Sequence, residues 1–191
     1  MENKEEFTKY ESRYFNLLMK IIDLNDPYKS GHSHKVASLA ELISLEIGFV
    51  GEKLNHIKEA SMFHDIGKVM LPGDLWVIPQ EIEADEEREI IQKHPEVGAR
   101  LLEESDFDQD VVRIVRYHHE WWDGTGYPEQ LKGEEIPLMA RIVAIAESYV
   151  SMITYNIYSE DMEKEDAINQ IIKLRGSQFD PDVVDSFLEV I

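Results

Sequence analysis

Two adjacent histidines stand at the head of a glycine-containing loop in the stretch HHEWWDGTGYP, which runs from His118 to Pro128. A second stretch, FHDIGK from Phe63 to Lys68, places a histidine directly before an aspartate. Imidazole combined with carboxylate suits a divalent iron, manganese or zinc ion. One carboxylate has two oxygens and can bridge two ions, and two ions can clamp a phosphate for in-line attack. These residue types therefore favour a metal site for phosphoester chemistry.

Each histidine also has an ordinary structural interpretation. The chain has seven histidines, and a single histidine is most often a surface residue or a satisfied core residue. Adjacent side chains on a helix point about 100° apart, so His118 and His119 reach one site only if the helix unwinds near them. Otherwise one faces the core and the other faces solvent. His94 precedes Pro95, which places it at a helix start. His56 is interpreted as an exposed residue.

The elements that must position these residues are helices, because apolar residues recur at helical spacing along most of the chain. Gly48 ends the second of them, and Asp180 with Pro181 begins the last. No stretch alternates polar and apolar residues as a strand does, so we predict an all-α fold. The helices before the last one are expected at about 5–24, 36–47, 54–63, 84–93, 95–104, 108–119, 137–158 and 163–175.

Composition limits the class of function. The chain of 191 residues is long enough for one domain with a substantial core, and its formal charge is −20. A negative field of this kind repels nucleic acid polymers and anionic membranes. No apolar run approaches the length of a membrane span, and the first residues lack the features of a signal peptide. We therefore expect a cytoplasmic protein that binds neither nucleic acid nor membrane. The absence of cysteine excludes thiolate metal sites.

Six motifs in order carry a resemblance to a known family. They are HSHKV from His32, FHDIGK from Phe63, HPEVG from His94, HHEWWDGTGYP from His118, IPLMARI from Ile136 and FDPDVV from Phe179. The chain resembles the HD-GYP family of bacterial signalling proteins, a branch of the HD-domain metal-dependent phosphohydrolases. The resemblance implies an HD-domain helical bundle with a GYP loop over residues 26–191. Residues 1–25 are then an N-terminal helix that packs on this core or on the second subunit of a homodimer.

The resemblance also implies an activity and a set of ligands. The activity is hydrolysis of cyclic di-GMP, a bacterial second messenger, to a linear dinucleotide or GMP through a metal-bridging hydroxide. The implied cofactors are two divalent metal ions, usually iron or manganese. Asp65 is implied as the bridge between two metals. The first metal would be held by His32, His64, Asp65 and Glu147, and the second by Asp65, His94, His118 and His119.

The same resemblance implies the residues that meet the substrate. Lys68 corresponds to the family lysine that contacts the scissile phosphate, so Lys68 and Asp65 are the implied catalytic residues. The loop that names the family would form a wall of the substrate site, through Gly126, Tyr127 and Pro128. The aromatic ring of Trp121 could stack on a purine.

Two metal-site positions depart from the family pattern. Glu147 stands where the family has an aspartate, and its side chain is one methylene longer. Tyr28 stands where some members have a glutamate that supports a third metal, so two ions are expected here. About 25 residues precede the match, and we therefore expect signal input from a protein partner or from a part outside this chain.

The basic residues that usually hold substrate phosphate are fewer here. Trp121, Asn156 and Ser159 stand where the family commonly has basic residues. Each charge-assisted hydrogen bond to phosphate is worth roughly 1.5–3 kcal/mol. Arg141 remains, and it could bind either the substrate phosphate or a carboxylate at the edge of the core. Three functions stay open: hydrolysis of cyclic di-GMP, hydrolysis of another nucleotide phosphoester, and a catalytically weak nucleotide-binding or regulatory module.

Overall fold

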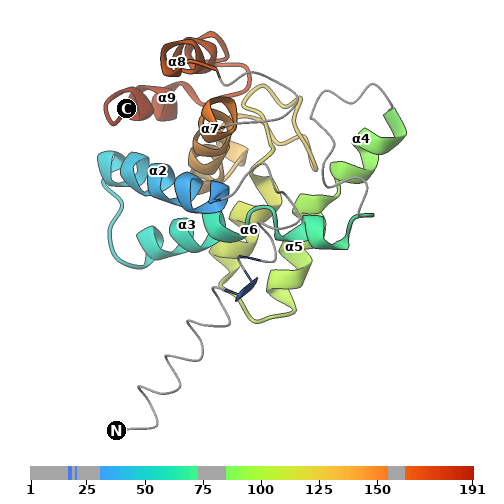
Figure 1. The fold of residues 1–191 in the computed structure, drawn as a ribbon. Helices are drawn as coiled ribbons and strands as arrows, with labels where there is room; N and C mark the ends of the chain where they lie inside the picture. Colours follow the sequence, from blue (N-terminus) through green and yellow to red (C-terminus); the bar gives the residue numbers. More distant parts are fainter. Residues whose placement is uncertain (1–16, 19, 21–30, 73–84, 155–161) are drawn as a thin grey trace, which may run out of the picture.

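The computed structural model describes residues 17–18, 20, 31–72, 85–154 and 162–191, and this part of the chain consists of helices joined by turns and loops (Figure 1). It contains no strand, and Arg175 and Phe179 form one isolated β-bridge. The all-α prediction is confirmed. The α-helices are α2 (His32–Ile47), α3 (Glu52–Phe63), α4 (Asp85–Ile91), α5 (His94–Glu103), α6 (Gln109–Tyr117), α7 (Leu138–Ile153), α8 (Lys164–Lys173) and α9 (Pro181–Leu188), and the 3-10 helices are η1 (Ile66–Met70) and η3 (Gly133–Glu135).

Local sequence sets where several helices begin and end. Gly48 ends α2 in the left-handed region, at φ 96°, where a residue without Cβ is favoured. Asp108 caps α6, since its carboxylate accepts from the backbone N–H of Asp110 at 2.8 Å. Asp180 caps α9 in the same way, and Pro181 occupies the first turn, as predicted.

Four helices enclose the core. α2 packs on α3 and α7, and α6 packs on α3 and contacts α7. α5 packs on α6 and on η1 at one side, and α8 and α9 cover α7 on the other (Figure 1). The interior is filled by fully buried aliphatic and aromatic side chains, among them Ile43, Ile57, Ile114, Ile142, Ile145, Ile171, Phe179 and Phe187. This packing brings the ends of α3 and α6 close to the middle of α7.

Some predictions fall outside the described residues. Of the expected helix at 5–24, only Leu17, Leu18 and Lys20 are described, and all three have helical backbone. Tyr28, Asn156 and Ser159 also lie outside that part of the chain. α7 is described to Ile153, short of the predicted end at residue 158. Among the described helices, none has both the length and the apolar character needed to cross a membrane.

Candidate metal centre

The seven predicted ligands come together in two groups. Within each group, one nitrogen or oxygen per residue lies within 4.8 Å of the others. Six of the seven residues are buried, and the side chain of His119 is 15% exposed. The first group is His32, His64, Asp65 and Glu147, and the second group is His94, His118 and His119.

Asp65 lies between the two groups. Its Oδ2 is 3.4 Å from His64 Nε2, and its Oδ1 is 3.3 Å from His94 Nε2. Lys68 Nζ donates a hydrogen bond to Asp65 Oδ2 at 2.7 Å. Burial alone would raise the pKa of Asp65, but Lys68, His64 and His94 hold that pKa well below its usual value. The carboxylate is therefore ionised, and each of its oxygens faces a different group.

Helix ends orient three of the imidazoles. His64 follows the last residue of α3, His118 follows the last residue of α6, and His94 begins α5 just after α4. In each ring, Nδ1 donates to the carbonyl three residues earlier, at 2.7, 2.7 and 2.8 Å respectively. Such carbonyls have no partner within their own helix. Because a carbonyl only accepts, Nδ1 of each ring carries a proton, and Nε2 is the nitrogen that faces the site.

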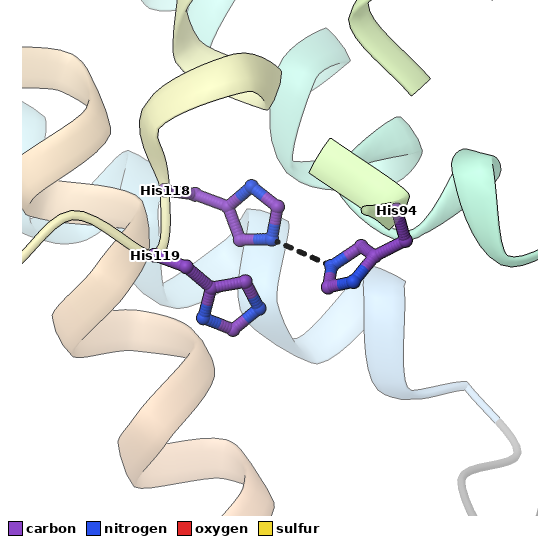
Figure 2. A group of neighbouring side chains, drawn as sticks. All are labelled: His94, His118 and His119. Atoms are coloured by element: carbon purple, nitrogen blue, oxygen red, sulfur yellow. Dashed lines mark hydrogen bonds between the residues drawn. The ribbon is translucent and has the colours of Figure 1, made fainter. Parts of the chain in front are cut away.

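The second group has imidazole nitrogens that face one another and that a bound cation would satisfy. Nε2 of His94 and Nε2 of His118 lie 3.3 Å apart, along the dashed line in Figure 2. Burial lowers the pKa of His94 to about 3 and that of His118 well below 6.5, so both rings are neutral. Two lone pairs then face each other at hydrogen-bond distance with no proton to share.

The first group also contains buried polar atoms that a bound cation would satisfy. Within the described residues, the buried His64 Nε2 and Asp65 Oδ1 have no hydrogen-bond partner. Buried polar atoms without partners are costly, and a coordinated cation satisfies them. The donor set of imidazole nitrogen and carboxylate oxygen also suits a divalent transition metal. Both groups therefore fit a metal ion.

The end of α6 lets both members of the histidine pair reach the site. The predicted helix to residue 119 is too long, because α6 ends at Tyr117 and a turn follows. The rings of His118 and His119 are 4.2 Å apart at 44°, and both face His94 (Figure 2). The alternative with one ring in solvent is therefore wrong. Unwinding at this point removes the 100° separation that a continuing helix would impose.

Gly67 brings Asp65 close to His94. A Cβ at Gly67 would lie 2.0 Å from the carbonyl oxygen of His94 and 2.6 Å from the amide nitrogen of Gly98. Only glycine permits the backbone of η1 to pack this closely on the first turn of α5.

The GYP loop folds directly over the second group. A Cβ at Gly126 would lie 2.3 Å from the amide nitrogen of Trp121, so the loop closes tightly on itself. Tyr127 N–H donates to the His119 carbonyl at 3.1 Å, and the Tyr127 ring stacks on the His119 ring at 4.8 Å. The peptide between Tyr127 and Pro128 is cis. Burial raises the pKa of Tyr127 well above 10, so its hydroxyl stays protonated. Trp121 is 37% exposed beside this loop.

Sequence reasoning missed Glu120, which ties the loop together. Its side chain is buried, and its two carboxylate oxygens accept from Glu129 N–H at 2.6 Å and Leu131 N–H at 3.0 Å. These bonds close the loop that carries Tyr127 over His119. The signal was an acidic residue between two histidines and two tryptophans, where a solvated charge is out of place.

Arg141 serves the fold. Its Nε donates to the Ile136 carbonyl at 2.9 Å, and its Nη1 pairs with the buried carboxylate of Asp180. The guanidinium also lies over the Trp122 ring, 5.5 Å from its centroid. The reading in which Arg141 pairs with a carboxylate at the edge of the core is confirmed. Asp180 thereby caps α9 and binds α7 to it.

His56 corrects one prediction. Its side chain is only 20% exposed, and its Nδ1 lies 3.8 Å from an Asp108 oxygen and 3.7 Å from an Asp110 oxygen. It is therefore a partly buried residue of α3 that faces the start of α6, and not an exposed one. His34, two residues after His32, is exposed on α2 and belongs to neither group.

Comparison with known proteins shows the family to which the chain belongs. The family model described as HD domain matches residues 16–183. A cyclic di-GMP phosphodiesterase of Thermotoga maritima is 35% identical over 98% of this chain and 52% of its own length. The cyclic di-GMP phosphodiesterase response regulator RpfG of Xanthomonas campestris is 32% identical over 98% of this chain and 50% of its own. A solved cyclic GMP-AMP specific phosphodiesterase of V. cholerae superposes with TM-score 0.73 at 21% identity, over 93% of this chain and 48% of that one.

The chain therefore belongs to the HD-domain family, and its Gly126–Pro128 loop places it in the HD-GYP branch. It spans about half the length of the curated relatives that it matches.

Proposed function

We propose that this chain is a metal-dependent phosphodiesterase that hydrolyses a cyclic dinucleotide, with cyclic di-GMP as the first candidate and a linear dinucleotide or GMP as the product. The observation that carries this proposal is the convergence of seven predicted ligands in two groups that share Asp65. Two imidazole-rich groups joined by one carboxylate are suited to two divalent ions. We propose iron or manganese, at two ions per chain.

The residues of the site have separable tasks. His32, His64, His94, His118, His119, Asp65 and Glu147 would hold the metals. The chemistry that a bound metal pair supplies is polarisation of the phosphoryl oxygens and activation of water at neutral pH. Lys68 orients Asp65 through the 2.7 Å hydrogen bond, and its ammonium has three donors, so it can also donate to a phosphate oxygen. Tyr127 holds the His119 ring by stacking.

We propose a substrate wall formed by the GYP loop. Gly126, Tyr127 and Pro128 lie immediately beside His119, and Trp121 exposes part of its ring next to them. Aromatic rings stack on any nucleobase, at about 1–3 kcal/mol per base. This contact supports a nucleotide substrate without deciding which base it carries.

A weak binding or regulatory module is the second candidate, because the described arginines beside the site are already paired. Arg116 pairs with Glu96 at 3.3 Å and Glu129 at 2.9 Å, and Arg141 pairs with Asp180. The sequence at 73–84 and 155–161 contains no lysine or arginine. In the described part of the chain, the candidate phosphate contacts would be the metals and Lys68, which favours loose binding.

Metal analysis together with a hydrolysis assay tests the proposal. Protein purified anaerobically is expected to hold close to two iron or manganese ions per chain and to cleave cyclic di-GMP. Cyclic GMP-AMP and cyclic di-AMP serve as comparison substrates.

Asp65→Ala is expected to abolish hydrolysis, because it removes the only carboxylate that faces both His64 and His94 at under 3.5 Å among the described residues. His34→Ala is the matched control, since it removes an exposed histidine two positions from His32, and it should leave turnover unchanged. Unchanged turnover in Asp65→Ala would contradict the bridging role. Full metal content with nucleotide binding but no turnover would favour the regulatory module.

The cytoplasmic location, the homodimer and the protein partner for signal input remain predictions from the sequence.

A further inference from the structure

Glu147 contacts both ligand groups and not only the one to which the family pattern assigns it. It lies in the middle of α7, a helix of small and apolar residues, and it is 4% exposed. It belongs to the first group with His32, His64 and Asp65. Yet its Oε1 is 3.9 Å from His119 Nε2, and its Oε2 is 4.0 Å from His118 Nε2. Both carboxylate oxygens therefore face imidazoles of the second group.

These separations permit shared coordination. Bonds from zinc to nitrogen and oxygen are about 2.0–2.2 Å, so two atoms on one ion of this kind are at most roughly 4.4 Å apart. The distances from Glu147 to His118 and His119 fall within that limit. Asp65, the predicted bridge, meets the same condition toward His64 and His94, at 3.4 and 3.3 Å. Glu147 therefore meets the same geometric test toward the second group, while it also lies within 4.8 Å of the ligand atoms of the first.

Charge supports the same conclusion. The second group consists of three imidazoles and has no carboxylate of its own among the described residues. Buried cations need nearby anions, because burial removes the solvation that would otherwise stabilise them. Asp65 and Glu147 are the two carboxylates that reach this group. The glutamate at 147 is longer than aspartate by one C–C bond, about 1.5 Å, and this length lets a residue on α7 extend toward the end of α6.

We propose that Glu147 is a ligand shared by both metal positions, so that Asp65 and Glu147 together bridge the pair. This inference rests on the proposed metal site and goes beyond it, because it makes the two positions interdependent. Loss of one shared carboxylate weakens both positions, whereas loss of an unshared imidazole weakens one.

Manganese binding to the full chain, measured by calorimetry after chelation and dialysis, tests the proposal without any substrate. The variant His32→Ala/His64→Ala leaves the first group with no imidazole, so the remaining Mn²⁺ reports on the second group. Adding Glu147→Gln to that variant is expected to weaken this Mn²⁺ at least tenfold, since even residues behind a ligand change metal affinity by about 10–100-fold. An unchanged Mn²⁺ affinity would overturn the proposal that Glu147 is shared by both metal positions.

Glu147→Asp in the otherwise unaltered chain gives an independent test, because it keeps the carboxylate charge and shortens the side chain by one methylene. We expect one Mn²⁺ to bind as in the unaltered chain and the other at least tenfold more weakly. Two Mn²⁺ ions bound with unchanged affinities would refute the proposal. Circular dichroism of the metal-free variants checks that the helices remain. Fewer than two Mn²⁺ bound by the unaltered chain would instead contradict the proposed metal pair itself, which keeps the two failures distinct.

Discussion

Replacement of Gly67 by alanine should disturb the site through the backbone alone. The new Cβ would lie 2.0 Å from the His94 carbonyl oxygen, whereas carbon and oxygen in contact normally remain more than 3 Å apart. Since the nearest three atoms all belong to backbone, no side-chain rotation relieves the overlap. η1 and α5 must separate by about 1 Å. Overpacking typically costs 1–3 kcal/mol, and a clash with backbone places this change near about 3 kcal/mol.

Gly98→Ala is the matched control, because it lies across the same contact. Its Cβ would meet the Gly67 amide nitrogen and a Val115 methyl at 3.2 Å, which small shifts can relieve, so about 1 kcal/mol is expected. For a chain of this size, 1 kcal/mol lowers Tm by roughly 2–4 °C. We therefore expect Tm to fall by about 6–12 °C in Gly67→Ala and by about 2–4 °C in Gly98→Ala, measured by thermal melting of the metal-free protein.

The same pair of variants reports on the site. Separation of η1 from α5 moves Asp65 away from His94, so Gly67→Ala should also weaken Mn²⁺ binding, while Gly98→Ala leaves it within about threefold. The reasoning is refuted if Gly67→Ala proves as stable as Gly98→Ala and binds Mn²⁺ equally well.

Two further predictions concern buried ionisable side chains. Glu120→Ala removes the acceptor for two backbone amides, at roughly 1–2 kcal/mol each, so Tm should fall and the Tyr127 fluorescence or NMR signal should show a released loop. Glu129→Ala, which keeps both hydrogen bonds to Glu120, is the control, and equal loop order in the two variants would exclude this role for Glu120. The second concerns pH. Burial holds the pKa of His94 at about 3 in the fold, against about 6.5 in the unfolded chain. The unfolded state therefore binds a proton first as the pH falls, and metal-free protein should lose stability progressively from about pH 6.5 toward pH 3. A Tm that stays constant or rises over that interval would show that His94 is not buried as a neutral ring.

The sequence predicted the helices well, because they depend on local pattern. The ordered motifs singled out seven candidate ligands, and the structure gathers these residues in two groups. Apolar spacing located α2 and α3, and Asp180 with Pro181 located the start of α9. What failed depended on contacts between distant segments. The early end of α6 at Tyr117 arises from the site and the loop that follows, and no turn residue marks it.

The role of Glu120 was hidden for the same reason. Its partners, the amides of Glu129 and Leu131, become neighbours only when the loop closes. Likewise, the pairing of His56 with Asp108 and Asp110 joins α3 to the start of α6 across some fifty positions of sequence. Periodicity within one helix carries no information about such pairs.

The attachment of His64, His94 and His118 to carbonyls at helix ends has a consequence for how ions enter and leave. Each ring is steered by the polypeptide before any ion arrives, so an empty pocket retains its shape. Small zinc modules, by contrast, fold only around their metal. For the proposed metal site we therefore expect one ion to replace another without refolding of the chain, so that exchange depends on metal supply and affinity.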